Sequence, residues 1–360
     1  MCLPKLLRYC LLLVLLIPFW SIAQNGKANT SIGVQFHYGS FLTVKPKATY
    51  LKDSYSSFGE ISYIKQTDGS EAWQVANHLP QVGFSLAYGN TGSRQYMGKF
   101  LSGFAFSDFK IVRFHSYKLS ARFAGGVGWI EKPYDPVTNH KNTLIGSHFN
   151  AYVQLGIRNE VRLYHSIFLT GGVSLSHFSN GTFELPNLGL NIPAIDVGLR
   201  YQLAPGEKRT SPKDSFHKHM SYVVNATGGS KQMPIVGSSH YFVGGVSGEV
   251  NRHYSAGGAY GAFVQMFYDP SPIAPSDTVS IVESSRSWEM AAGIAFHKTL
   301  GRISVPVQVG FYLYNNHNKN FMYQSFGVRY TINSRWLAGA YLKTHMGQAD
   351  FIHLGVGYHW

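Results

Sequence analysis

His177 and Ser179 are the residues of this sequence whose types and spacing best suit catalysis. They lie in Ser166–Asn180, a predicted β-strand, and residues two positions apart on a strand point to the same face. A histidine beside a serine can act as a general base that activates the hydroxyl as a nucleophile. The same face carries Val173 and Leu175, so the polar pair lies on an otherwise apolar surface.

A polar residue on the returning strand completes the pattern. The next predicted strand is Ile192–Leu203, and Asn191 has the same parity as Ile195 and Val197. Asn191 therefore lies on the same apolar face as His177, at the same end of the hairpin. His177, Ser179 and Asn191 are therefore three polar side chains on one face of the hairpin.

The surrounding sequence resembles a known signature. Residues 177–180 (HFSN) and 186–191 (PNLGLN) resemble the active-site motif of the outer-membrane lipid A 3-O-deacylases, the PagL-type or acyloxyacyl hydrolase-like family. The likeness covers roughly residues 31–203. It implies a barrel that hydrolyses an ester-linked acyl chain from lipid A, part of lipopolysaccharide. It also implies His177 as the base and Ser179 as the nucleophile, with Asn180 and Asn187 forming or ordering the oxyanion site.

The sequence departs from this family at one position. The family's triad ends in a glutamate fourteen residues after the histidine, where this chain has Asn191. A carboxylate orients the histidine and stabilises the imidazolium, whereas an asparagine can only orient it. Glu184, in the connecting loop, is the alternative acid. Two interpretations therefore remain open: an esterase that works with asparagine, and a non-enzymatic transport or structural barrel with a degenerate site.

The amino terminus predicts export. Residues 1–23 have the pattern of a secretory signal peptide: Lys5 and Arg8 precede a short apolar run, and small residues follow it at positions 21 and 23, the minus-three and minus-one positions of a cleavage site. Both cysteines, Cys2 and Cys10, lie inside this segment. The mature chain is therefore predicted to contain no disulfide and no cysteine metal site.

The charge of the chain indicates its partners. The formal net charge of +13 predicts an anionic partner. No basic cluster with interleaved aromatic residues matches a nucleic-acid-binding motif, so we expect anionic lipid rather than nucleic acid. The chemistry expected of His177 and Ser179 requires no metal and no cofactor. The oligomeric state is left open.

Composition and periodicity predict an all-β fold. The chain is 44% hydrophobic and 15% aromatic, with 38 glycines, which favours strands. Apolar and polar residues alternate in many segments of about ten residues, the length of a membrane-spanning strand. The predicted strands are Ser31–Leu42, Phe58–Gln66, Pro80–Tyr88, Met97–Val112, Lys118–Glu131, His148–Leu163, Ser166–Asn180, Ile192–Leu203, His219–Gly228, Tyr241–Asn251, Gly257–Phe267, Trp288–His297, Arg302–Tyr314, Met322–Ile332, Trp336–Thr344 and Phe351–Trp360.

These strands predict an antiparallel transmembrane β-barrel of about 14–16 strands in the bacterial outer membrane. The alternative is an 8-stranded deacylase-like barrel followed by a second β unit. Residues 204–218 are charged, contain prolines and are predicted to be a linker. The linker separates a deacylase-like part, 24–203, from further barrel strands, 219–360. The last strand ends on an aromatic residue, Trp360, which resembles the terminal signal of outer-membrane barrel proteins.

Overall fold

The computed structural model of this chain describes residues 29–42, 46–204, 216–232, 236–271, 287–315 and 320–360. The predicted signal peptide and most of the predicted linker lie outside the described residues. Within them, antiparallel strands make up nearly all regular structure, beside a 3-10 helix, η2 (Pro46–Leu51), and a short α-helix, α2 (Ala72–Ala76). No helix in the described part of the chain is long and apolar enough to cross a membrane.

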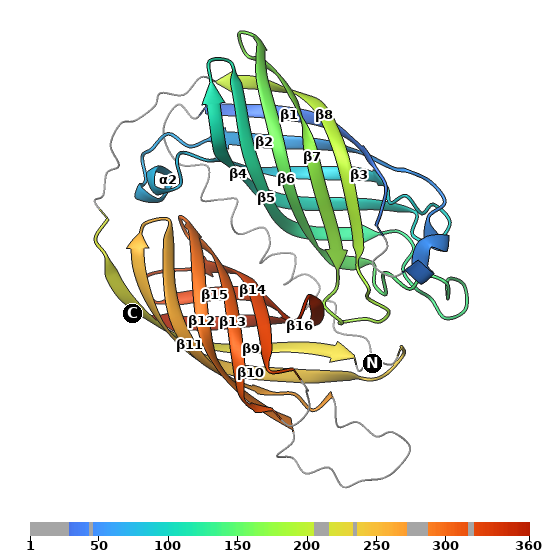
Figure 1. Cartoon of the computed structure of the whole chain (residues 1–360), viewed down its shortest axis with the longest axis vertical. Helices are drawn as coiled ribbons and strands as arrows, with labels where there is room; N and C mark the ends of the chain where they lie inside the picture. Colours follow the sequence, from blue (N-terminus) through green and yellow to red (C-terminus); the bar gives the residue numbers. More distant parts are fainter. Residues whose placement is uncertain (1–28, 43–45, 205–215, 233–235, 272–286, 316–319) are drawn as a thin grey trace.

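The first eight strands form a closed barrel, drawn in blue to yellow-green in Figure 1. They are β1 (Asn29–Gly39), β2 (Ser56–Gln66), β3 (Gln81–Asn90), β4 (Lys99–Phe114), β5 (Tyr117–Ile130), β6 (Phe149–Tyr164), β7 (Ile167–Ser179) and β8 (Leu190–Ala204). Each strand pairs with its neighbours in sequence, and β1 also pairs with β8. This last pairing closes the ring.

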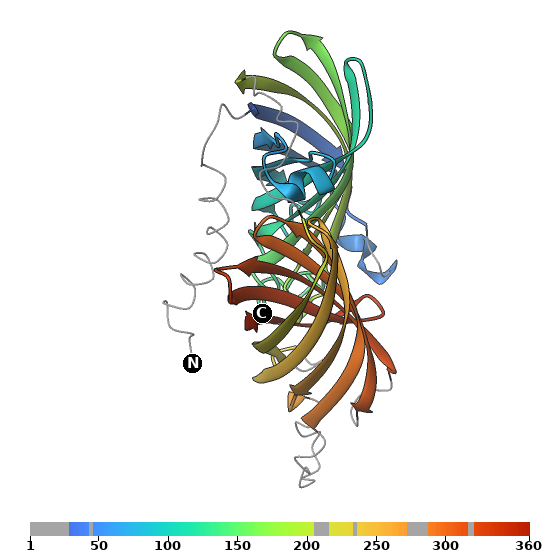
Figure 2. The same ribbon diagram turned by 90° about the vertical axis from the view of Figure 1, so that its left-hand side faces the viewer.

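The remaining eight strands form a second closed barrel. They are β9 (His219–Gln232), β10 (His240–Ser255), β11 (Gly258–Tyr268), β12 (Trp288–Leu300), β13 (Ile303–Asn315), β14 (Met322–Thr331), β15 (Trp336–His345) and β16 (Gln348–His359). Here β9 pairs with both β10 and β16. Figure 1 shows the two barrels next to each other as separate rings, and in Figure 2 some of their strands overlap in projection.

The predicted all-β, antiparallel barrel class is confirmed, and each of the sixteen predicted segments corresponds to one strand. The strands close as two rings of eight rather than as one larger ring. This is the alternative arrangement, a barrel followed by a second β unit. The physical reason is that β8 pairs back onto β1, so the first ring has no free edge left for the strands that follow.

The outer faces of the strands are apolar. On β7, Val173 and Leu175 are exposed on the outside, whereas Ser174 and Ser176 are buried inside. The same alternation gives β8 an outer row that includes Ile195. Apolar side chains outside and polar ones inside are the pattern of a barrel that sits in lipid.

Side chains fill the interior of the first barrel, as expected for a ring of eight strands. Beside the β7–β8 loop the filling is aromatic: the ring of Phe178 packs edge-on against Phe100 and Tyr152, with centroid distances of 5.2 and 4.9 Å. Further along the lumen it is ionic. Glu60 accepts a hydrogen bond from Arg122 at 2.9 Å and contacts His37 at 3.1 Å.

The barrel ends differ. Because the strand number is even, the chain enters and leaves each barrel at one end, and we call the opposite end the loop end. In the first barrel the loop end carries the connections 40–55, 91–98, 131–148 and 180–189. The last of these, the β7–β8 loop, follows Ser179 and extends toward the second barrel near β16 and β9 (Figure 1).

Candidate active site

The predicted site residues lie where β7 ends and β8 begins. His177 and Ser179 are among the last three residues of β7, and Asn191 is the second residue of β8. In the antiparallel register His177 is paired directly with Asn191. Their side chains share the outer face with Leu175 and Ile195, both of which are exposed. The three side chains therefore lie on the outer face of the barrel and not in the lumen; His177 and Asn191 are half-buried, and Ser179 is 7% exposed.

His177 is oriented by Asn191. The distance from His177 Nδ1 to Asn191 Oδ1 is 2.8 Å. A carboxamide oxygen only accepts hydrogen bonds, so the Nδ1 atom of His177 carries the hydrogen. The other ring nitrogen, Nε2, then holds the lone pair and is the atom that can take up a proton. Asn191 thus selects the tautomer that a general base requires, without supplying the negative charge of a carboxylate.

Ser179 is held by Asn187. The Ser179 hydroxyl accepts a hydrogen bond from Asn187 Nδ2 at 2.9 Å, and Asn187 Oδ1 also accepts one from the backbone N–H of Asn180 at 3.2 Å. The N–H of Gly181 donates to Ser179 Oγ at 3.3 Å. Side-chain and backbone N–H groups therefore converge on the hydroxyl. Donors in this position could bind the oxygen that becomes negative when an ester is attacked.

Among the described residues, no hydrogen bond joins His177 to Ser179. Residues two apart on a strand have Cα atoms about 6.6 Å apart, which is within the combined reach of an imidazole and a hydroxymethyl group. Catalytic hydrogen bonds are often long before substrate binds.

Asn180 orders the loop from within. Its Nδ2 donates to Ser147 Oγ at 2.9 Å and to the carbonyl oxygen of Glu184 at 2.8 Å. The recorded hydrogen bonds of Glu184 are made by its backbone, and no hydrogen bond in the described structure joins its carboxylate to His177. The alternative acid is thus not brought to the histidine, whereas Asn191 is.

Two further residues support the site and are not among the site residues predicted from the sequence. Ser147, on the β5–β6 loop, contacts Asn180, and nothing in its local sequence marks it. Gly189 adopts a positive φ of 76°, and a Cβ added there would come within 2.8 Å of His177 Cε1. A glycine is required at this position because a side chain would push the imidazole away. The presence of Gly189 in the 186–191 motif is the sequence signal that could have indicated this requirement.

Neighbouring loops at the same end are fastened to one another. The Asp53 carboxylate accepts hydrogen bonds from the backbone N–H groups of Arg94 and Gln95, both at 2.8 Å. Burial acts to raise the pKa of Asp53, but the hydrogen bonds from Gln95 and Arg94 outweigh it and hold the pKa below its ordinary value. Hydrogen bonds from Thr138 likewise lower the pKa of Asp135.

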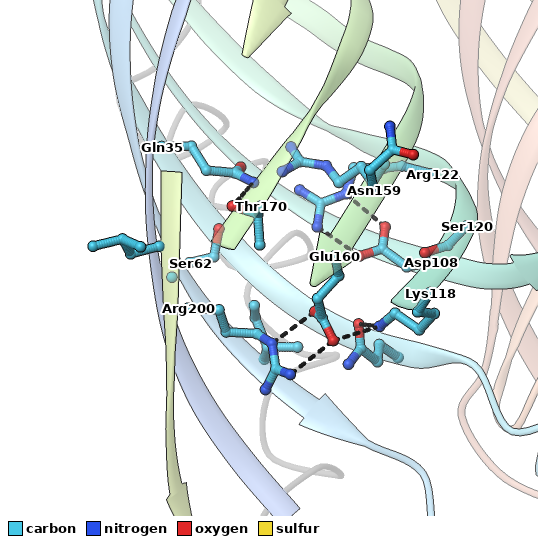
Figure 3. A pocket seen from close by; sticks show the side chains of 15 residues that line it. Gln35, Ser62, Asp108, Lys118, Ser120, Arg122, Asn159, Glu160, Thr170 and Arg200 are labelled. Atoms are coloured by element: carbon cyan, nitrogen blue, oxygen red, sulfur yellow. Dashed lines mark hydrogen bonds and ion pairs between the residues drawn. The ribbon is translucent and has the colours of Figure 1, made fainter. Parts of the chain in front are cut away.

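The lumen contains a second cluster of polar side chains, which form ion pairs with one another (Figure 3). Arg200 donates two hydrogen bonds of 2.8 Å to Glu160, and Lys118 lies 3.4 Å from the same carboxylate. Arg122 forms a bidentate pair with Asp108. These charges neutralise one another, and the side chains that carry them fill the lumen. They therefore block the lumen rather than line an open channel. In the described part of the chain no group of three or more His, Cys, Asp or Glu side chains could hold a metal ion.

Family models match both barrels. Residues 58–200 match the model described as lipid A 3-O-deacylase (PagL), and residues 220–360 match the model described as the C-terminal domain of acyloxyacyl hydrolase. Together the two matches span most of the chain. No curated protein sequence matches it.

Solved structures with some similarity are outer-membrane proteins. They include the toluene transporter TodX of Pseudomonas putida, with 8% identity, coverage of 94% of this chain and 91% of that one, and a TM-score of 0.19. CdiB of Acinetobacter baumannii has 9% identity, coverage of 93% and 60%, and a TM-score of 0.22. A porin of Rh. blastica has 8% identity, coverage of 92% and 100%, and a TM-score of 0.17. Scores this low support no conclusion about function.

Proposed function

Because this chain belongs to the lipid A 3-O-deacylase (PagL) family, we propose that it removes an ester-linked acyl chain from lipid A by Ser-His catalysis. The family points to hydrolysis in the outer membrane, and lipid A is the substrate that its name specifies. The observation that carries the proposal is the 2.8 Å contact between His177 Nδ1 and Asn191 Oδ1 on the lipid-facing side of the barrel.

In the proposed reaction, Ser179 Oγ attacks the ester carbonyl carbon while His177 Nε2 takes up the hydroxyl proton. The bond between the carbonyl carbon and the leaving oxygen then breaks, and the leaving oxygen takes the proton from His177. A water molecule, deprotonated by His177, then attacks the acyl-serine; the bond from the carbonyl carbon to Ser179 Oγ breaks, Oγ takes the proton back from His177, and the fatty acid is released. The enzyme returns to its starting state after these two steps.

The oxyanion formed in each step needs hydrogen-bond donors. The Gly181 N–H and Asn187 Nδ2 lie 3.3 and 2.9 Å from Ser179 Oγ, which supports them as donors to the carbonyl oxygen that binds beside it. Asn191 holds the His177 tautomer but carries no charge to stabilise the imidazolium. We therefore expect a slower enzyme than one with a carboxylate in that place.

The outward direction of the site supports a membrane lipid as substrate. An acyl chain lying against the apolar outer wall would be on the same side of the sheet as Ser179, which is 7% exposed, and would not have to enter the lumen. The filled lumen argues against the transport alternative, because Arg158 and Arg200 are engaged with Glu60 and Glu160 rather than lining an open path.

The test is mass spectrometry of lipid A from cells that produce the wild-type chain, Ser179→Ala or His177→Ala. We expect loss of one acyl chain with the wild type and intact lipid A with either variant. Ser166→Ala, in the turn at the other end of β7, is the matched control and should deacylate normally. Intact lipid A in wild-type cells would instead support the degenerate-site interpretation, and activity in Ser179→Ala would exclude Ser179 as the nucleophile.

A further inference from the structure

The β7–β8 loop, residues 180–189, is attached to the second barrel. Gln232, the last residue of β9, makes two of the contacts: its Oε1 accepts a hydrogen bond from the N–H of Leu185 at 2.8 Å, and its backbone N–H donates to the carbonyl of Thr182 at 3.1 Å. The Gln232 side chain is 7% exposed. This contact is a specific one, because breaking it would leave buried polar groups without hydrogen-bond partners.

Strands β10 and β16 hold the same loop. His240 Nε2 lies 2.9 Å from the carbonyl oxygen of Phe183, and the two rings lie 5.2 Å apart. The Thr182 hydroxyl donates a hydrogen bond to the carbonyl of Asp350. A Cβ added to Gly181 would come within 2.4 Å of Ile352 Cγ1. Three strands of the second barrel thus contact consecutive residues just after Ser179.

The strand ends that hold the loop are themselves fixed. Lys231, next to Gln232, points into the second lumen, and its Nζ lies 2.7 Å from the Asp350 carboxylate. Lys343 pairs with Asp350 at 3.4 Å. Opposite charges in a nearly dry lumen attract strongly. The ions therefore tie β9 to β16 at the place where both strands contact the loop.

A second attachment prevents the barrels from rotating against each other. At the end opposite the loop end, Asn77 Nδ2 donates to the carbonyl oxygen of Thr299 on β12 at 2.9 Å. The indole of Trp73, on α2, would meet a Cβ added to Gly301 at 3.2 Å. Contacts at both ends define one relative position of the two barrels.

We propose that the second barrel positions the nucleophile of the first, and that Gln232 and His240 are its positioning residues. The proposal rests on the function proposed for Ser179. Leu185, which Gln232 holds, lies two residues from Asn187, whose amide binds the Ser179 hydroxyl. Displacement of the loop would move Asn187 and Gly181 together, and so move both donors away from the oxyanion.

The experiment compares the full-length wild type with Gln232→Ala and with Gln232→Ala/His240→Ala in detergent micelles containing lipid A. Misplacement of catalytic groups by about 1 Å can cost about 100-fold in rate. We expect kcat to fall about 10- to 100-fold while KM stays within about twofold, because the lipid-binding outer wall is unchanged. Hydrogen–deuterium exchange should accelerate at the Leu185 amide.

Gln324→Ala is the matched control. Gln324 lies at the loop end of the second barrel and accepts a hydrogen bond from Met346 N–H at 3.1 Å, and among the described residues no hydrogen bond joins it to the β7–β8 loop. This variant should keep the wild-type kcat and the wild-type exchange at Leu185. A loss of kcat equal to that of Gln232→Ala would show that any damage to this rim reduces activity, and would overturn the positioning role.

The outcomes separate the two proposals. Fast exchange at Leu185 with unchanged kcat in Gln232→Ala overturns the positioning role and leaves the proposed function intact. Unchanged exchange in that variant also overturns the positioning role, since Gln232 would then not hold the loop. An inactive wild type overturns the proposed function, and the catalytic part of this proposal with it. Fast exchange together with low kcat supports both.

Discussion

His177 and Asn191 face each other across the β7–β8 ladder, with Nδ1 and Oδ1 2.8 Å apart on the outer wall of the barrel. The pair fixes which imidazole nitrogen is available as a base. It also shows what the site lacks, since the partner of the histidine is neutral.

Asn191→Glu tests directly whether the site lacks a negative charge beside His177. We expect kcat to rise about tenfold or more, the effect of about 1.4 kcal/mol of added stabilisation of the imidazolium. Asn191→Gln has the same side-chain length without the charge and should not gain activity. Both variants are assayed for fatty acid release from lipid A. A fall in kcat with glutamate would mean that Asn191 does not occupy the place of the acid.

Asn187→Ala removes the amide that holds the Ser179 hydroxyl at 2.9 Å. Loss of one oxyanion donor costs about 100- to 1,000-fold in kcat, and we expect a loss in this range with little change in KM. Steady-state kinetics in lipid A micelles measures both constants. Asn333→Ala, in the turn between β14 and β15, is the control. A loss below about threefold would exclude Asn187 from the oxyanion site.

Gly181→Ala should lower activity because the new methyl group meets Ile352 and because φ at this residue is 61°. Adding Ile352→Ala removes the two closest side-chain atoms, so we expect the double variant to recover part of the lost kcat. Recovery should be incomplete, since a left-handed backbone costs a non-glycine residue about 1–2 kcal/mol. No recovery at all would argue against the contact between the barrels.

The Asp53 contact with the 91–98 loop should depend on pH. The folded pKa lies below the ordinary value, so the charged form is favoured and its contribution is complete above about pH 4. The contribution is lost as the pH falls through the folded pKa. Hydrogen exchange at the Arg94 and Gln95 amides, corrected for intrinsic rates, should accelerate below that point. Asp53→Asn should remove this pH dependence, whereas Asp135→Asn should preserve it.

Glu60→Ala should destabilise the first barrel. Glu60 contacts Arg122 and Arg158 inside the lumen, and removing one partner of a buried ion pair costs about 3–5 kcal/mol where the remaining charge has no other partner; Arg122 keeps Asp108, so we expect a loss at the lower end of this range. Urea unfolding in detergent, followed by gel mobility of the folded and unfolded forms, measures the change. Glu71→Ala, at an exposed position before α2, should have no measurable effect. A loss below about 1 kcal/mol would show that other groups compensate the arginines.

The strands and the face of the site could be predicted because both depend on local periodicity. The parity of His177 and Asn191 follows from the two-residue period of a strand. The size of the ring could not be predicted in this way: β1 has the same alternation whether it pairs with β8 or with a later strand. The hydrogen bond from the Leu185 N–H to the Gln232 side chain joins residues 47 positions apart, so no local sequence pattern could predict it.

The outward direction of His177 has a kinetic consequence. If His177 is the base of the proposed esterase, the substrate meets it from the lipid-facing side, by lateral diffusion in two dimensions. The rate of the esterase should therefore follow the mole fraction of substrate at the surface and not the bulk concentration. Adding inert detergent at constant total lipid A should therefore slow the reaction. The detergent lowers the mole fraction of lipid A at the micelle surface, whereas the bulk concentration of lipid A stays the same.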